Sequence, residues 1–456
     1  MFREYDIRGR ENESELNSTT IELIGKAYGT FLRARGITDA VIGHDSRATS
    51  ENFYKICSAA LQSSGIHVTG IGMCLTPMMY WAQYHFNTKG GLMITASHNP
   101  AGWNGLKLSL GFSYTLIGNE VQEILKTAED GKFTAAPGSF KEEKIDALYI
   151  KDLVSRVRLH RKLKILLNTA NATSSYFSPQ LFRQFGCEVI EHNTNPDPTY
   201  PHYPPNPANV AMIKDTGAQV IKNGCDLGIA IDADGDRLGI TDEKGQAVWP
   251  DRYAILLARS ILKHTPGAKI VFDVKVSEAL PEDIRAHGGI PIMWKTGHSH
   301  VKKKVHEEKA KLAVEQSGHV FFTDNFYGFD DGNFAAVKLI ELLSLQSEPL
   351  STLVGQTPYY VSTPAYHAHT ADGIKYGIVE KLTAEFKKDG NRVVDINGAR
   401  VYFENGGWGL VRASSNLPAL VLRFEAKDES SLKDIEKIFR TKLAQFPEVA
   451  TEWESA

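Results

Sequence analysis

A pattern of strands and helices occurs three times before residue 320, and it limits the fold more than any other feature of this sequence. In each unit an apolar strand ends in Asp or Asn, a helix-like segment follows, a glycine opens a second strand, and a third strand ends in polar side chains. The strand-like segments are 40–45, 65–68 and 91–94 in the first unit, 164–168, 186–190 and 227–231 in the second, and 269–273, 289–293 and 311–314 in the third.

Short apolar strands that alternate with helices indicate βαβ units and a mainly parallel sheet. In such sheets, ligands bind at the carboxyl ends of the strands. The third strands of the three units lead into Ser97, Asp232 and Glu315 in turn. We therefore expect three domains that point these strand ends at a shared cleft.

The domain boundaries are expected in polar segments that carry Gly or Pro. These are 131–147, 242–246 and 350–358, and the last one is followed by alternating strands with two helix-like segments, 374–389 and 431–446. The sequence thus predicts three similar α/β domains with mixed, mainly parallel sheets, followed by a C-terminal α+β domain. The predicted domains are 1–145, 146–243, 244–355 and 356–456.

Composition excludes several classes of partner. The 54 acidic and 51 basic side chains give a net charge of -3, which offers no basic surface for nucleic acid or an anionic membrane. The four cysteines contain no CxxC pair and are expected to be reduced, mostly buried thiols. The start of the sequence lacks the apolar core of a signal peptide, and the apolar stretch 253–262 is too short to span a bilayer. We expect a cytoplasmic protein.

The segment DADGDR (232–237) follows an apolar strand directly. Asp232, Asp234 and Asp236 would repel one another without a cation, and all-oxygen ligands suit Mg²⁺ or Ca²⁺. The alternative is a solvated acidic turn. The spacing to Glu243 also imitates an EF-hand loop, but Arg237 stands where that loop needs glycine and the flanks are strand-like. A cation beside an arginine fits a site for phosphoryl charge.

Ser97 lies in ITASHNPAGWNGLK (94–107), at the end of a strand-like run. Turn-forming residues surround it, so an ordinary tight turn is the alternative to a nucleophile. The GxSxG context of an α/β-hydrolase is missing. With a metal available, a serine can instead carry a phosphoryl group. Lys107 follows two flexible glycines, and by itself it fits an exposed structural lysine better than a role at this site.

Two further clusters have ligand-binding chemistry. Glu315, Ser317 and His319 alternate at a strand end and suit the vicinal hydroxyls of a sugar, with core or turn residues as the alternative. Lys275 and the segment 295–299, which contains His298, add positive charge and donors to the same rim. RASSNLP (412–418) combines an arginine with hydroxyl and amide donors, which is typical of an anion nest or of an ordinary turn.

Together these segments resemble the α-D-phosphohexomutases, and among them the bacterial phosphomannomutase/phosphoglucomutase branch. The resemblance covers essentially the whole chain, in the family's order. It is carried by EYDIRG (4–9), TASHNP (95–100), DADGDR (232–237), WKTGHS (294–299), EQSGH (315–319), WGLVRAS (408–414) and LVLRFEA (420–426).

The resemblance implies four domains around a central cleft and a set of residue roles. Ser97 would be the phosphoserine and would bind Mg²⁺ with Asp232, Asp234 and Asp236. The remaining catalytic candidates are Lys107, with an inferred part in proton transfer, Arg8 and Arg237, which would hold the reactive phosphoryl group, and His98. The substrate-binding candidates are His298, Glu315, Ser317 and His319 for the sugar, and Arg412, Ser414, Ser415 and Asn416 for the non-reacting phosphate. Lys275 is a further substrate-binding candidate, because it adds positive charge to the same rim.

The implied reaction moves a phosphoryl group from Ser97 to a hexose 1- or 6-phosphate and returns the other phosphate after the bisphosphorylated sugar reorients. Mg²⁺ and a hexose 1,6-bisphosphate activator belong to this expectation, as do a monomer or homodimer and a small sugar phosphate as ligand. The chain departs from the family's wording at Val314, Asn416 and 168–172. EQSGH is typical of phosphoglucosamine mutases, so a phosphoglucosamine mutase is one alternative. A metal-dependent sugar phosphatase and a sugar-phosphate sensor without catalytic activity are two others.

Overall fold

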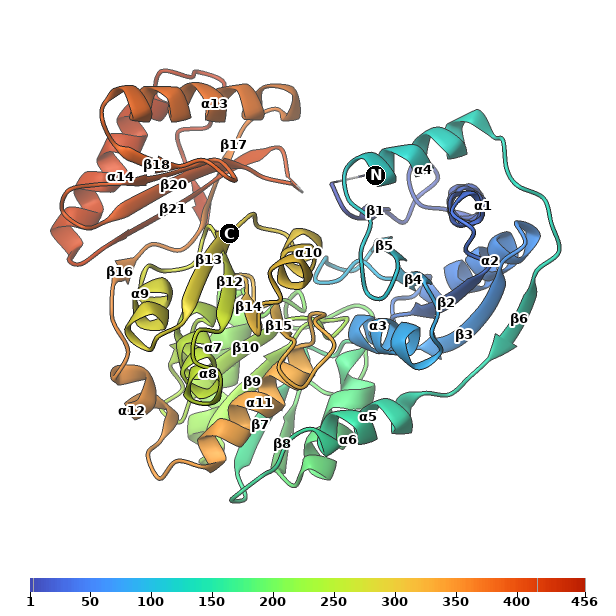
Figure 1. Ribbon diagram of the computed structural model, residues 1–456, viewed down its shortest axis with the longest axis horizontal. Coiled ribbons are helices and arrows are strands. Elements are labelled where there is room, and N and C mark those ends of the chain that lie inside the picture. The colour runs from blue at the N-terminus through green and yellow to red at the C-terminus, as the bar shows by residue number, and fades with distance from the viewer. Residues whose placement is uncertain (3, 416, 456) are drawn as a thin grey trace.

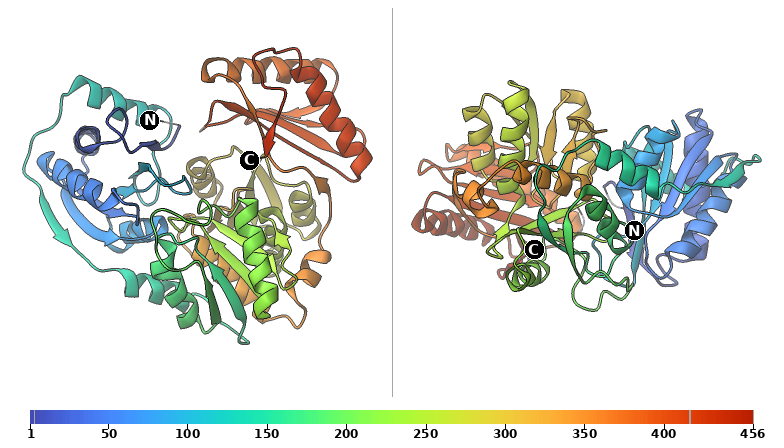
Figure 2. Two further views of the ribbon diagram at one scale, coloured as in Figure 1. Left: turned by 180° about the vertical axis from the view of Figure 1, so that it is seen from behind. Right: turned by 90° about the horizontal axis from the view of Figure 1, so that it is seen from below.

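The computed structural model describes residues 1–2, 4–415 and 417–455. Four sheets follow one another along the chain, and we call the parts built on them domains I to IV. Figure 1 shows domains I, II and III in an arc, with domain IV packed on domain III and standing across from domain I. The view from behind in Figure 2 gives the same arrangement.

Domain I has a mixed sheet of six strands in the order β1-β5-β4-β2-β3-β6. Strands β2, β3, β4 and β6 are parallel, whereas β5 runs antiparallel to both β1 and β4. Its elements are β1 (Ile7–Arg10), α1 (Ser18–Ala34), β2 (Asp39–His44), α2 (Ser50–Ser63), β3 (His67–Met73), α3 (Thr76–His85), β4 (Gly90–Ile94), β5 (Trp103–Leu110), α4 (Asn119–Asp130) and β6 (Ser139–Glu142).

Domain II repeats the parallel core and ends in a hairpin, with strand order β11-β10-β9-β7-β8. Every residue of β9 and β10 is buried, as the continuous apolar run predicts for a strand covered on both faces. The elements are α5 (Asp146–Ser155), β7 (Lys164–Asn168), α6 (Ser174–Phe185), β8 (Glu188–His192), α7 (Val210–Asn223), β9 (Leu227–Ile231), β10 (Leu238–Asp242) and β11 (Ala247–Val248).

Domain III has the strand order β13-β12-β14-β15, in which β15 is the antiparallel member. Its elements are α8 (Pro250–His264), β12 (Lys269–Asp273), α9 (Ala279–Ala286), β13 (Ile290–Trp294), α10 (His298–Glu308), β14 (Leu312–Val314), β15 (Val320–Phe322), α11 (Gly332–Ser344) and α12 (Leu350–Gly355).

Domain IV is an antiparallel sheet in the order β18-β19-β20-β21-β17-β22, with β16 paired to β21. The elements are β16 (Val361–Ser362), β17 (Tyr366–His369), α13 (Asp372–Lys388), β18 (Arg392–Val394), β19 (Ala399–Tyr402), β20 (Trp408–Ala413), β21 (Ala419–Ala426), α14 (Glu429–Leu443) and β22 (Glu454–Ser455). The predicted fold class, three similar α/β domains and a C-terminal α+β domain, is confirmed.

The hydrophobic core shows how the domains are joined. One large cluster of buried side chains combines α3 of domain I with α5 of domain II and α8 and α11 of domain III. Domain IV has a core of its own, built around Leu382, Phe386, Phe424 and Phe439. Domains I to III are therefore joined by shared apolar packing, which is the main stabilising term in folding.

Three segments differ from the pattern expected from the sequence. Strand β5 contains Lys107, which lies in a sheet and is 1% exposed, so the interpretation of this lysine as an exposed structural one is wrong. The predicted linker 131–147 contains β6, which pairs with the edge of the first sheet. The predicted break at 242–246 is the turn of the β10–β11 hairpin, where Asp242 N donates to Gln246 O.

All four cysteines are buried and free, and burial raises the pKa of Cys57 to about 12. Among the residues that the structure describes, no helix is long and apolar enough to cross a membrane.

Candidate active site

Ser97 sits at the carboxyl end of β4 in a loop whose backbone is held in place. Its φ of 51° is in the left-handed region, which is sparsely populated for a residue with a Cβ. Ser97 N donates to Thr95 Oγ1 at 2.8 Å, and Arg47 Nη2 donates to Ser97 O at 2.6 Å. Arg47 also donates to the carbonyls of Asn99, Pro100 and Trp103. This arginine was not predicted from the sequence, although DSR directly follows the first strand of the repeat.

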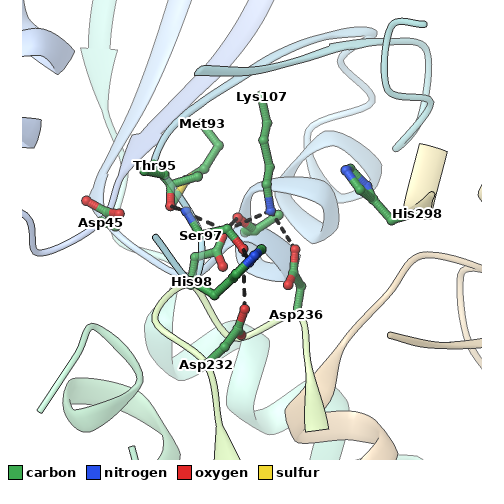
Figure 3. Close-up of polar contacts among 12 residues, drawn as sticks. Asp45, Met93, Thr95, Ser97, His98, Lys107, Asp232, Asp236 and His298 are labelled. Carbon is green, nitrogen blue, oxygen red and sulfur yellow. Dashed lines mark hydrogen bonds and ion pairs between the residues drawn. The ribbon is translucent and has the colours of Figure 1, made fainter. Parts of the chain in front are cut away.

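The hydroxyl of Ser97 points toward domain II (Figure 3). Its Oγ lies 3.4 Å from Asp232 Oδ2 and 3.1 Å from His98 Nδ1. Burial, and then the charges of Arg237 and Arg8, lower the pKa of His98 well below its ordinary value. His98 is therefore a neutral imidazole at neutral pH beside the serine.

Asp232, Asp234 and Asp236 are 0% exposed and form a cluster in which one oxygen of each lies within 4.8 Å of the others. The Oδ1 atoms of Asp234 and Asp236 are buried and have no hydrogen-bond partner among the described residues. Burial, together with the charges of Asp236 and Asp234, raises the pKa of Asp232 well above its ordinary value. Unpaired carboxylate oxygens in a buried acidic cluster are the chemistry that a hard divalent cation satisfies.

Lys107 of β5 places a positive charge beside the aspartate cluster. The antiparallel register places it across from Met93 on β4, four residues before Ser97. Its Nζ lies 2.7 Å from Asp234 Oδ2 and 2.5 Å from Asp236 Oδ2 (Figure 3). Burial alone would lower the pKa of Lys107, but the two carboxylates raise it well above its ordinary value. Lys107 is therefore an ammonium group.

Two arginines flank the serine. Arg8, from β1, donates to Asp6 Oδ2 at 2.6 Å and to Asn99 Oδ1 at 2.8 Å. Arg237, from the loop after β9, donates through Nε to His319 Nε2 at 3.1 Å. Both side chains line the cleft, which places two guanidinium groups close to the Ser97 loop. Such forks suit a phosphoryl group.

The predicted sugar-binding residues form the domain III wall of the cleft. Glu315 Oε1 accepts a hydrogen bond from Gly297 N at 2.6 Å, whereas its Oε2 is buried without a partner among the described residues. Burial raises the pKa of Glu315 and lowers that of His298 to about 4. Ser317 and His319 line the same wall.

The domain IV wall carries the predicted phosphate loop. Arg412, at the end of β20, donates to Ser415 Oγ at 3.1 Å, and Leu417 N donates to Ser414 Oγ at 3.2 Å. Lys375 of α13 holds the backbone of this loop by donating to Ser414 O at 2.6 Å. No motif points to Lys375, because it lies on a helix 39 residues before Ser414. The predicted residue Asn416 is outside the described residues.

All these walls face one cleft with a volume of about 610 Å³. Most of the predicted residues line this cleft. Ser97, Lys107 and the three aspartates adjoin it through their contacts with His98 and with one another. The predicted lining residues are Arg8, His98, Arg237, Lys275, His298, Glu315, Ser317, His319, Arg412, Ser414 and Ser415. Thr296, from the predicted segment 295–299, also lines the cleft, as do Tyr5 and His367, which the sequence did not single out.

A buried serine beside three carboxylates, at the centre of four domains in this order, is the arrangement of the α-D-phosphohexomutase class. Family models described as phosphoglucomutase/phosphomannomutase domains I, II, III and the C-terminal domain match residues 1–135, 147–245, 249–360 and 369–442. The chain belongs to the phosphoglucomutase/phosphomannomutase family.

Relatives and solved structures agree with this assignment. The chain is 37% identical to the phosphomannomutase/phosphoglucomutase of Pseudomonas syringae pv. tomato over 97% of this chain and 95% of that one. It is 35% identical to a phosphoglucomutase of Neisseria meningitidis serogroup A, over 98% and 97% of the two chains. A crystal structure of a phosphoglucomutase/phosphomannomutase family protein from Burkholderia thailandensis superposes with a TM-score of 0.92, at 35% identity and 98% coverage of both chains.

Proposed function

We propose that the protein is a phosphohexomutase that interconverts hexose 1-phosphate and hexose 6-phosphate, with mannose or glucose as the sugar, through a phosphoserine at Ser97. The observation that carries the proposal is the presence of two anion-binding walls in one cleft. Arg8, Arg237 and Lys107 surround the serine, while Arg412 and the Ser414–Ser415 hydroxyls stand on domain IV. A mutase must hold a reacting and a non-reacting phosphate at once, and the two walls meet that need.

The residues present fit a magnesium ion. The three aspartates leave two buried oxygens unpaired, and Ser97 Oγ lies 3.4 Å from one of the carboxylates. We assign Ser97, Asp232, Asp234 and Asp236 as its ligands. When bound, Mg²⁺ would spread the charge of the transferring phosphoryl group.

In the first step the P–Oγ bond of phospho-Ser97 breaks and a bond from phosphorus to a sugar hydroxyl forms. The departing Oγ needs a proton or a positive charge beside it, and the hydroxyl must give up its proton. Lys107, held as an ammonium by two carboxylates, suits the role of donor rather than acceptor. His98 is the neutral group beside the serine, and its imidazole offers a lone pair for the hydroxyl proton.

The bisphosphorylated sugar then turns over in the cleft, so that its second phosphate reaches Ser97 and the first binds the domain IV loop. The ring hydroxyls are held by Glu315, Ser317, His298 and His319 in both orientations. Because domain IV contributes no described residue to the large buried cluster that joins domains I to III, it is the part that we expect to close and exclude water.

We also propose a ligand, an activator, a cellular location and an oligomeric state for the protein. The ligand is a small sugar phosphate, a hexose 1,6-bisphosphate acts as activator, and the protein is a cytoplasmic monomer or homodimer.

A panel of substrates tests the function. Mannose, glucose and glucosamine 1-phosphates are assayed in parallel with Mg²⁺ and a trace of the matching 1,6-bisphosphate, and both isomer exchange and free phosphate are measured. We expect exchange with mannose or glucose phosphates and little free phosphate. Exchange confined to the glucosamine substrate would identify a phosphoglucosamine mutase, and free phosphate without exchange would identify a sugar phosphatase.

A further inference from the structure

The segment between β12 and α9 carries Lys275 into the cleft, yet domain IV holds its backbone. Arg400 of β19 donates through Nη1 to Val274 O at 2.8 Å and to Val276 O at 2.7 Å. Arg423 of β21 donates to Lys275 O. Three consecutive carbonyls of domain III are therefore bound by two arginines of domain IV.

Both guanidinium groups are buried, Arg400 at 0% and Arg423 at 4% exposure. A buried charge is costly unless it is paired. Arg400 lies 2.9 Å from Glu278 Oε2, and Arg423 lies 3.2 Å from Asp251 Oδ2. The carboxylates balance the charge through the Nη2 atom of each arginine, and the Nη1 atoms donate to the backbone that carries Lys275.

Apolar packing and a third carboxylate, that of Glu425, strengthen the same attachment. Val274 packs with Trp408 and Leu410 of β20 in one buried cluster. Glu425 Oε1 accepts hydrogen bonds from Glu278 N at 2.8 Å and from Trp408 Nε1 at 2.7 Å. The Lys275 segment thus has side-chain and main-chain partners in domain IV.

The strand register connects this interface to the phosphate loop. Leu410 pairs with Arg400 on one side and with Arg423 on the other, so these side chains lie on one face of the sheet. Arg412 comes two residues after Leu410 on the same strand, and alternation places it on that face as well. One sheet face therefore carries both the arginines that hold the Lys275 segment and the arginine of the phosphate loop.

We infer that Arg400 and Arg423 are positioning residues that fix Lys275 to domain IV, so that Lys275 and the Arg412 loop bind the substrate's non-reacting phosphate as one unit. The inference rests on the proposed function for the identity of the ligand. When domain IV moves, Lys275 moves with it, and the distance between the two cationic groups stays constant. Arg400 and Arg423 act through Lys275 and do not touch the substrate.

A double-mutant cycle tests the inference with R423K, K275M and the combined variant. R423K keeps a cation beside Asp251 but loses the planar fork that also reaches Lys275 O. We measure KM and kcat for glucose 1-phosphate, and Kd for glucose 6-phosphate by calorimetry. R423K alone should raise KM and Kd about tenfold while kcat changes by less than about threefold, the pattern of lost uniform binding.

In the K275M background, R423K should have almost no further effect on KM or Kd, because residues that act through one another are not additive. The same fold-change in both backgrounds would overturn the inference, as would an unchanged KM in R423K. Y402F is the matched control. It removes the hydrogen bond from Tyr402 to Glu278 Oε2 in the same interface without touching the three carbonyls, and it should leave KM unchanged. A loss in Y402F equal to that in R423K would also overturn the inference.

Hydrogen exchange gives a readout independent of turnover. The amides of 274–278 should exchange faster in R423K than in wild type or Y402F, and equal exchange in all three would count against the positioning role. A wild-type protein that binds glucose 6-phosphate without turnover would refute the mutase reaction, while the cycle could still be evaluated from Kd. A wild type that binds neither sugar phosphate would contradict the proposed function directly, and the exchange data would then decide the structural part.

Discussion

Lys107 Nζ lies 2.7 Å from Asp234 Oδ2, and this ion pair joins the sheet of domain I to the loop that ends β9 of domain II. Both side chains are almost completely buried. Thr76 Oγ1 of α3 donates to the same carboxylate oxygen at 2.7 Å. Burial alone would raise the pKa of Asp234, but Lys107 and Thr76 lower it below its ordinary value. The contact between the first two domains is thus built from the groups proposed to carry the reaction.

Replacing Lys107 by Met should destabilise the protein, because it leaves Asp234 and Asp236 buried without their cation. Breaking a buried pair in this way costs about 3–5 kcal/mol. The thermal midpoint should fall sharply in chelator and recover in part with Mg²⁺, and turnover should be lost. Lys26→Met, which breaks an exposed 2.6 Å pair with Glu22, is the control and should leave both unchanged. An unchanged midpoint in Lys107→Met would contradict the prediction.

Ser97→Ala should abolish mutase turnover, by at least about 10³-fold, because it removes the nucleophile. Binding of glucose 6-phosphate, measured by calorimetry, should persist. Intact mass spectrometry should find a phosphate on the wild type after incubation with bisphosphate, and none on the variant. Ser113→Ala is a matched control, since Ser113 also has a left-handed backbone, with φ 58°, and should remain active. Full activity of Ser97→Ala would rule out the phosphoserine.

Removal of divalent cations should abolish turnover and lower the thermal midpoint. Added Mg²⁺ should stabilise the wild type by about 2.7 kcal/mol at 100 times its Kd, and should stabilise Asp236→Asn less. Glu243→Gln is the control. Glu243 completes the EF-hand-like spacing but accepts a hydrogen bond from Ser351 N at 3.1 Å, so its replacement should leave the Mg²⁺ effect intact. Turnover that survives in chelator would exclude a metal role.

Asp331 should make the stability depend on pH. It caps α11 through Phe334 N and accepts a hydrogen bond from Tyr149 at 2.6 Å, and burial raises its pKa to about 7. Between about pH 4 and 7 the folded state then binds a proton that the unfolded state has released, so stability falls as pH rises through this range. Asp331→Asn removes this loss.

Thermal midpoints at pH 5 and pH 8 check this prediction. The advantage of Asp331→Asn over wild type should grow toward pH 8, by an amount on the order of 1–3 kcal/mol. Asp428→Asn is the control. Asp428 caps α14, and its hydrogen bonds from Ser431 lower the pKa of this carboxyl, so the effect of the substitution should be the same at both pH values. A constant effect of Asp331→Asn would show that this carboxyl is ionised throughout.

Much of the fold could be predicted because the information was local. Strands β7, β9 and β12 begin and end at the predicted residues, since a buried parallel strand shows as an unbroken apolar run bounded by polar residues. Strands β5 and β6 were missed. Trp103–Leu110 mixes polar and apolar residues because it lies beside the active site, and Ser139–Glu142 is an exposed edge whose four residues carry no apolar pattern.

The domain class, the order of the motifs and the types of side chain available for phosphoryl transfer follow from the amino-acid sequence alone, because each is a property of a short segment or of its repetition. Which of these groups meet depends on the folded chain. Lys107 is buried between two aspartates through the pairing of β5 with β4, and Lys275 is held by Arg400 and Arg423 from more than 120 residues away. Such contacts depend on strand register and on the packing of separate domains, and no local pattern of residues encodes either of them.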